Sequence, residues 1–237
     1  MEVINKPYQA EEASQRIDSY LEMLGKDKTI SFLNAVPDMD ENREPAIPVR
    51  VTIVCVAFEF PPKDDGNENR HWKQMVATQA LVKEMLMVMM DSTHYCDTIV
   101  VGNYIYGIFS TPFKTQIDEM LETLAKINSS KDLVAMKLRV KGIEAPKLKI
   151  GADFGAVLRT SITLRENERC FSWNGTRFKL LERMVDQQMN EDKDIVVTER
   201  FKQNLKKEYQ EYMMPQNENY VANVRNIAIK KWIEEHE

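Results

Sequence analysis

The spacing of hydrophobic positions changes several times along the chain, and each spacing predicts a different element. Residues 51–60 are almost wholly apolar and rich in β-branched side chains, which is typical of a strand buried on both faces. Over 72–90 the apolar positions instead form a wide stripe at helical spacing. Two β-rich runs within 98–109 flank the dipeptide Gly102-Asn103. This arrangement predicts a β-hairpin whose tight tip is Gly102-Asn103.

The second half of the chain continues with a helical pattern over 115–140 and then with shorter signals. Residues 147–154 alternate between apolar and polar side chains, which predicts a strand with one buried face. Asp153 lies on the polar side of that strand, where an isolated carboxylate is expected to face solvent. The remaining predicted elements are a strand over 169–173, a helix over 177–189, a strand over 194–197, a helix over 199–207 capped by Thr198, and a C-terminal helix from about Tyr220.

The order strand, helix, hairpin, helix, strand, strand, helix, strand predicts an α+β fold. It matches the ferredoxin-like βαββαβ pattern, with a mixed, mainly antiparallel sheet and helices on one face. Residues 1–49 form a separate extension in this interpretation, with a helix over 10–24 and a polar linker over 34–48. Residues 50–237 then form the main domain.

Composition and charge argue against several classes of partner and site. The chain has 237 residues and a net charge of −5, from 32 basic and 37 acidic side chains. Nucleic acids and anionic membranes bind proteins through a basic face, which a mildly acidic chain lacks. Neither is therefore expected as a partner. The three cysteines, Cys55, Cys96 and Cys170, have no CxxC spacing, which argues against a disulfide scaffold and a zinc site. These features predict a cytoplasmic protein.

Several segments, taken in order, carry a resemblance to a known family. They are 51–59 (VTIVCVAFE), 99–109 (IVVGNYIYGIF), 149–155 (KIGADFG), 173–184 (WNGTRFKLLERM) and 223–232 (NVRNIAIKKW). Together they resemble the class III nucleotide cyclase homology domain, and more specifically the bacterial pyrimidine (uridylate or cytidylate) cyclase branch of Pycsar antiphage defence. The resemblance implies a cyclase-homology domain over 50–237.

The resemblance also implies where metal ions would bind. Family members hold two Mg²⁺ or Mn²⁺ ions with two aspartates, one in the first strand and one at the hairpin tip. Those positions align with Ala57, which has no ligand atom, and Asn103, whose amide is a neutral and weaker ligand. Glu59 faces the same side of the strand as Ala57 and is a possible substitute, although a charge at a strand end explains it as well. No cofactor is expected, and Mg²⁺ or Mn²⁺ only if the chain is active.

The other half of the family's site binds the nucleotide. Arg183 matches the basic residue that meets the transition-state charge, whereas Lys179 stands where the family has an asparagine. Their i, i+4 spacing places both cations on one helix face. Thr176 stands where the family has an aspartate. Trp173 either stacks on a base or packs under the turn, and packing is favoured.

The pattern of substitutions predicts a catalytically degenerate cyclase that binds a nucleoside triphosphate or a cyclic nucleotide and forms a homodimer. A second possibility is a heterodimer in which an active cyclase supplies the aspartates and this chain supplies Arg183 and Lys179. A third is an active pyrimidine cyclase, making cyclic UMP or cyclic CMP, with a metal site built from Glu59, Asn103 and Asp153. A fourth is a structural interaction protein.

Overall fold

A computed structural model describes residues 9–22, 32–37, 46–61, 68–165 and 168–236 of the chain. It divides into two units, residues 1–31 and 32–237. In the first unit, the described part of the predicted 10–24 helix is α1, Ala10–Leu21, whose Ile17 and Leu21 are exposed. Position 24 and residues 38–45 of the predicted linker lie outside the described residues.

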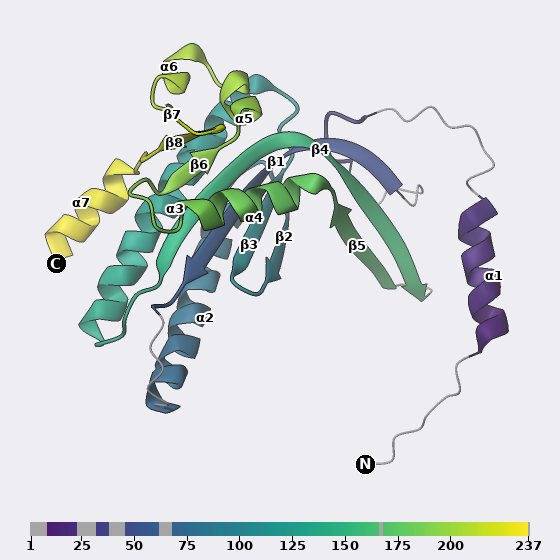
Figure 1. Cartoon of the computed structure of the whole chain (residues 1–237), viewed down its shortest axis with the longest axis horizontal. Helices are drawn as coiled ribbons and strands as arrows, with labels where there is room; N and C mark the ends of the chain where they lie inside the picture. The colour runs from purple at the N-terminus through teal and green to yellow at the C-terminus, as the bar shows by residue number, and fades with distance from the viewer. Residues whose placement is uncertain (1–8, 23–31, 38–45, 62–67, 166–167, 237) are drawn as a thin grey trace. The chain divides into compact units, whose positions relative to one another are not determined.

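The second unit is built on one eight-stranded sheet with the strand order β2-β3-β1-β4-β6-β8-β7, and with β5 paired to β4 (Figure 1). All its strand pairs are antiparallel except β4 with β6. The strands are β1 Ala46–Glu59, β2 Tyr95–Val101, β3 Tyr104–Phe109, β4 Lys147–Arg165, β5 Glu168–Asn174, β6 Ile195–Val197, β7 Met214–Gln216 and β8 Asn219–Ala222. The predicted α+β class with a mainly antiparallel sheet is confirmed.

Helices cover both faces of this sheet. The helices of this unit are α2 Glu68–Met90, α3 Lys114–Val140, α4 Thr176–Gln188, α5 Glu199–Asn204, α6 Lys207–Gln210 and α7 Ile227–His236. Side chains of α2, α3 and α5 pack with one set of sheet residues, which includes Val54 and Val56 of β1. Side chains of α4 pack with the alternate set, which includes Ile53 and Cys55 (Figure 1). The prediction of helices on one face only is therefore wrong, because β1 is buried on both sides and each side needs its own cover.

The two longest strands explain how the sheet is held together. β1 pairs with β4 from Ala46↔Thr160 to Glu59↔Lys147, and β4 then continues beyond β1 to pair with β5. The predicted hairpin is confirmed, and Gly102 at its tip has a φ of +55°, in the left-handed region that favours glycine. The prediction that 147–154 has one buried face is wrong, since Lys149 and Asp153 are 6% and 1% exposed.

The C-terminal part differs most from its prediction. The residues around Tyr220 form the β7–β8 hairpin rather than the start of a helix, and α7 begins only at Ile227. The hairpin turns through Asn217, which has a φ of +54°. Among the described residues, no helix is long and apolar enough to cross a membrane.

Candidate functional site

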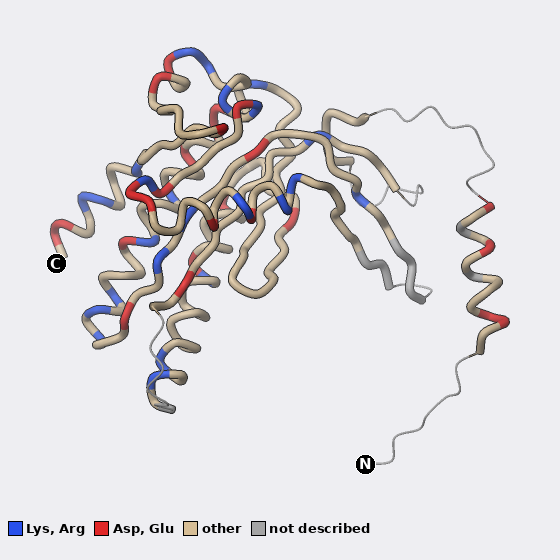
Figure 2. The backbone as a smooth tube through the Cα atoms, viewed as in Figure 1, with Lys and Arg blue, Asp and Glu red and all other residues tan. Residues whose placement is uncertain are grey.

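Helix α4 carries basic and acidic side chains, which lie on different faces of the helix. Basic positions precede and then mix with acidic ones along its backbone in Figure 2. Because side chains three or four residues apart share a helix face, Glu182 and Asp186 lie together on one side. Arg177 and Arg183 line a pocket on another side of the helix.

The acidic side of α4 is bonded to strand β3. The Tyr106 hydroxyl donates to Glu182 Oε1 at 2.5 Å, and the Tyr104 hydroxyl lies 2.9 and 3.0 Å from the two carboxylate oxygens of Asp186. Burial, followed by the hydrogen bond to Asp186, raises the pKa of Tyr104 to about 12. Burial and the bond to Glu182 also raise the pKa of Tyr106 above its ordinary value. Both phenols therefore stay protonated as donors and fix α4 to the sheet.

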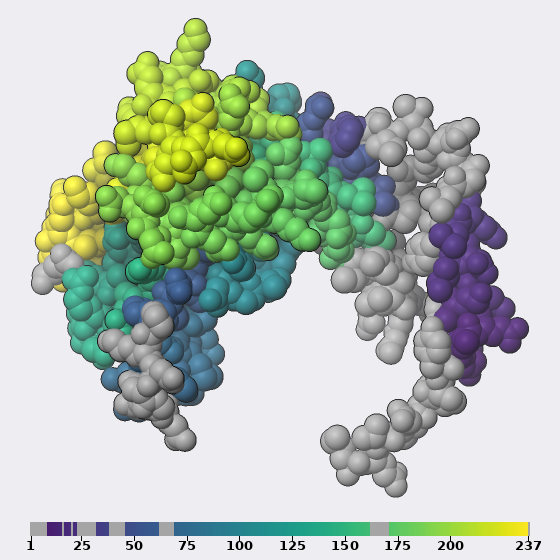
Figure 3. All heavy atoms as spheres, in the orientation of Figure 1, coloured from purple at the N-terminus to yellow at the C-terminus, as the bar shows by residue number. Residues whose placement is uncertain are grey.

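The pocket side of α4 is open. Its cavity of about 510 Å³ is bounded by α4, by the first turns of α5 and by the β7–β8 turn. Figure 3 shows the side chains of α4 (green) on the near face, with the C-terminal segment (yellow-green) above them. The lining residues are Arg177, Leu180, Arg183, Met184, Gln187, Thr198, Glu199, Arg200, Gln203, Glu218 and Asn219. We call this cavity the arginine pocket.

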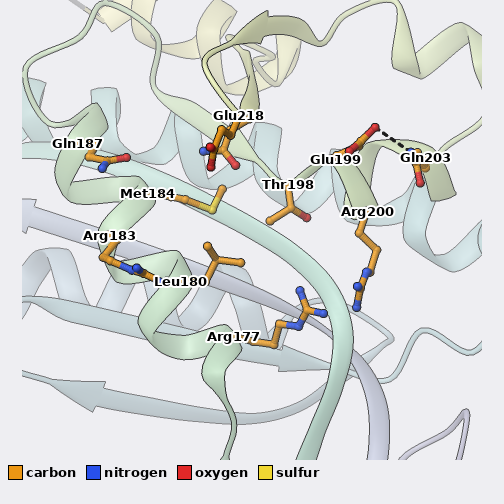
Figure 4. A pocket seen from close by; sticks show the side chains of 11 residues that line it. Arg177, Leu180, Arg183, Met184, Gln187, Thr198, Glu199, Arg200, Gln203 and Glu218 are labelled. Carbon is orange, nitrogen blue, oxygen red and sulfur yellow. Dashed lines mark hydrogen bonds between the residues drawn. The ribbon is translucent and has the colours of Figure 1, made fainter.

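Charges in the arginine pocket are segregated. Figure 4 shows the guanidinium groups of Arg177, Arg183 and Arg200 toward one side and the carboxylates of Glu199 and Glu218 toward the other. Such a pocket suits a ligand with an anionic end and a hydrogen-bond-donating end. Arginine is well suited to bind phosphate because its planar donor group can form two parallel hydrogen bonds.

The three arginines differ in their partners. Arg177 Nη1 lies 3.0 Å from Asp153 Oδ2, and that pair holds Arg177 in place. Arg183 Nε donates to the main-chain oxygen of Lys179 at 3.3 Å. Within the described part of the chain, neither Arg183 nor Arg200 takes part in an ion pair. Their charges are available to an anionic ligand.

The structure places the nucleotide-binding residues expected from the sequence in different surroundings. Arg183 lines the arginine pocket, whereas Lys179 and Thr176 are exposed and do not line it. Trp173 is 8% exposed, packs in the core under α4 and donates from Nε1 to Asp97 Oδ2 at 2.8 Å. The indole of Trp173 is thus part of the core, as expected from the interpretation that this residue packs under the turn.

Sequence reasoning missed Arg177, Arg200 and Asp153 as parts of one site. Arg177 and Arg200 are 23 positions apart and come from separate helices, so no local spacing relates them. The sequence held one signal of this site, the acidic residue Asp153. It pairs with Ile53, in the buried centre of β1. A buried carboxylate needs a cationic partner, and Arg177 is that partner.

The hairpin tip brings together the residues aligned with the metal positions. Ala57, Glu59 and Asn103 line a cavity of about 320 Å³ together with Tyr104 and Asp186. Backbone pairing holds them there, since Phe58 N donates to Asn103 O at 3.1 Å. Asp153 is not among them. Glu59 pairs with Lys147 of β4, and Asp153 lies six residues further along that strand, which is about 20 Å from Lys147.

The two positions aligned with the family's metal ligands do not fit a pair of divalent metal ions. Ala57 offers a methyl group, Asn103 a neutral amide, and both oxygens of Asp186 already accept from Tyr104. Among the described residues, no group of three or more His, Cys, Asp or Glu side chains could hold a metal ion. The carboxylates of this cavity belong to Glu59 and Asp186, so neither aligned position supplies one of the anionic oxygens that two hard dications need.

The fold is similar to that of class III nucleotide cyclases. The chain aligns with the guanylyl cyclase Cya2 at a TM-score of 0.61 and 11% identity, covering 78% of this chain and 96% of that one. It aligns with a class III adenylyl cyclase-like ATP-binding protein from Pseudomonas aeruginosa at a TM-score of 0.62 and 16% identity, covering 93% and 50%. It aligns with the adenylyl cyclase CyaB of P. aeruginosa at a TM-score of 0.56 and 10% identity, covering 76% of this chain and 97% of that one. No family model and no curated protein sequence matches the chain.

Proposed function

We propose that this chain, which has the fold of the class III nucleotide cyclases, binds a nucleoside triphosphate in the arginine pocket without cyclising it. The observation that carries the proposal is a cavity of about 510 Å³ lined by Arg183 and Arg200, which form no ion pair with any residue that the structure describes. A cavity of that volume is within the range of small-molecule sites. The phosphates would meet the arginines, and the ribose hydroxyls would donate to Glu218 on the opposite side.

Two further points support nucleotide binding. Arg183 occupies the position that, by the sequence resemblance, carries the transition-state cation in active cyclases. One of the similar structures is named as an adenylyl cyclase-like ATP-binding protein, so a protein of this fold is described by binding rather than by cyclisation. A guanidinium can hold a triphosphate in the ground state as well as during reaction.

The hairpin tip is the reason for proposing that cyclisation is lost. Attack of the ribose 3′-oxygen on the α-phosphate needs its charge offset by metal ions. The donors at Ala57 and Asn103 do not fit those ions. In this proposal binding and catalysis rest on separate parts of the molecule, and the arginine pocket keeps the charged residue of the family pattern, Arg183.

The sequence resemblance extends the proposal to a biological setting. A cytoplasmic, Pycsar-like signalling system is the setting that the pyrimidine-cyclase motifs suggest. There the chain would act as a homodimer, or beside an active cyclase that supplies the missing aspartates. Mixing with such a cyclase tests the second arrangement: activity that appears in the mixture should be lost with Arg183→Ala.

The proposal is tested by incubating the purified protein with ATP, GTP, CTP and UTP, each with Mg²⁺ or Mn²⁺. Calorimetry measures binding, and mass spectrometry measures cyclic product. We expect at least one triphosphate to bind, with Arg183→Ala weakening it and Lys83→Ala leaving it unchanged. Lys83 is exposed on α2, across the sheet from α4, and its loss removes the same unit of charge.

Two outcomes contradict the proposal. A cyclic product that disappears in Asn103→Ala would make the chain an active cyclase with an unusual metal site. An unchanged melting temperature with all four triphosphates would leave a structural interaction protein, because a ligand that binds only the folded state raises that temperature.

A further inference from the structure

A buried carboxylate lies directly behind the arginine pocket. Asp153, on β4, is 1% exposed and does not itself line the cavity. Its two oxygens have different partners: Oδ2 accepts from Arg177 Nη1 at 3.0 Å, and Oδ1 accepts from the Thr198 hydroxyl at 2.6 Å. Arg177 belongs to α4, and Thr198 precedes α5. One side chain therefore joins the two helices that form the walls of the pocket.

The connection to α5 continues beyond Thr198. The Thr198 hydroxyl oxygen also accepts from Phe201 N at 3.1 Å, so this residue caps α5. Arg200 lies between these two residues and points into the pocket (Figure 4). Fixing Thr198 against Asp153 thus fixes the turn of helix that presents Arg200.

The connection to α4 requires an unusually close approach to the strand. The guanidinium of Arg177 lies over Gly155, where an added Cβ would come within 2.8 Å of Arg177 Nε. A side chain at 155 would therefore displace the Arg177 guanidinium from its place beside β4, where it reaches Asp153. With its side chain 20% exposed, Arg177 still contributes to the pocket wall.

We propose that Asp153 is the positioning residue of the arginine pocket, setting Arg177 and Arg200 for a ligand with more than one phosphate group. This inference rests on the proposed function. Arg177 and Arg183 are six residues apart on α4, so their Cα atoms are separated by about 9 Å along the helix axis. A polyphosphate chain can contact cations spread over that length with a different phosphate group at each, whereas a single phosphate requires the two side chains to converge on it.

Positioning and simple electrostatics make opposite predictions for Asp153→Asn. If Asp153 acted only as a charge, its removal would raise the positive potential of the pocket and strengthen the binding of anions. If Asp153 positions Arg177, its removal weakens binding. The asparagine oxygen can still accept from Thr198, so the cap of α5 is kept and the loss falls on Arg177.

The test is a double-mutant cycle measured by calorimetry with inorganic tripolyphosphate, inorganic phosphate and UTP. We expect Asp153→Asn and Arg177→Ala each to weaken tripolyphosphate binding about tenfold. The double variant should bind within about twofold of Arg177→Ala, because residues that act through one another are not additive. Inorganic phosphate should bind more weakly than tripolyphosphate, and Asp153→Asn should reduce that preference. Equal or tighter binding by Asp153→Asn, or additive losses, would overturn the proposal.

A second variant keeps the test decisive if Asp153→Asn does not fold. Gly155→Ala changes no charge, yet its methyl group displaces the Arg177 guanidinium. We expect weaker tripolyphosphate binding with an unchanged circular dichroism spectrum, and unchanged binding would contradict positioning. Failure of this inference is distinct from failure of the proposed function. In the first case the wild type binds and Arg183→Ala weakens binding while Asp153→Asn does not. In the second case the wild type binds none of the three probes.

Discussion

The two sides of α4 carry similar numbers of charges and use them in different ways. On the side facing β3, Glu182 and Asp186 each accept from a tyrosine hydroxyl. On the pocket side, Arg183 has only a main-chain oxygen as its partner, although it is held by the same backbone. Charges whose hydrogen bonds are complete stabilise the fold, and charges whose bonds are incomplete can bind a ligand. The difference predicts that substitutions on the two sides will have separable effects.

The largest effect is expected on the pocket side. The double substitution Arg183→Ala and Arg200→Ala removes the two pocket arginines that form no ion pair with the described residues. We expect UTP affinity to fall about 100-fold, since each charge-assisted contact is worth about tenfold. The melting temperature without ligand should stay close to that of the wild type, because exposed charges contribute little to stability. Calorimetry and a thermal melt measure the two quantities, and a large loss of stability would show that the arginines serve the fold.

An intermediate effect is expected on the sheet side. Tyr106→Phe leaves Glu182 without its donor in a half-buried position. We expect the free energy of unfolding to fall by about 1–3 kcal/mol. UTP affinity of the folded protein should remain within about twofold. Urea denaturation measures the first, with Tyr212→Phe as control, because Tyr212 is 62% exposed. A comparable loss in the control would show that removing a tyrosine hydroxyl is destabilising in general, and would contradict a specific contribution of the bond to Glu182.

The smallest effect is expected in the pH dependence of the sheet side. The pKa of Tyr104 is raised from 10.0 to about 12, so the folded state holds its proton more tightly than the unfolded state. Its contribution to stability is therefore complete below pH 10 and is lost as pH rises through 12. We expect the unfolding midpoint to fall over that range, and to fall less in Tyr104→Phe. Phenolate absorbance follows the titration, and ionisation of all tyrosines near pH 10 would argue against the bond to Asp186.

Much of the fold could be predicted because its signals are local. The apolar run of β1, the stripe of α2 and the Gly102-Asn103 turn each define one element. The sidedness of the helices was predicted wrongly, although the residues of β1 contained the correction: a strand buried on both faces needs cover on both faces. The β7–β8 hairpin was missed because its strands have three and four residues, too short for a period to show.

Less of the site could be predicted, because it depends on contacts between distant segments. Arg183 was found through its place on α4. Arg177 is on the same helix, but its role follows from Asp153, which is 24 residues away in the sequence and was expected to face solvent. Glu218 and Arg200 enter the pocket from a hairpin and a short helix whose placement no local pattern specifies. Burial of polar residues is a tertiary property, and Lys149 and Asp153 show it on a strand that reads as half polar.

The hairpin tip keeps its shape through main-chain atoms. Gly102 provides the turn. The main-chain oxygen of Asn103, rather than its side-chain amide, accepts from Phe58 N. A change of side chain at 103 therefore leaves folding almost untouched, and selection for a stable protein would not resist it. Chemistry and architecture can be inherited independently at such a position. A lineage could lose a reaction there, or regain one, without passing through an unfolded ancestor.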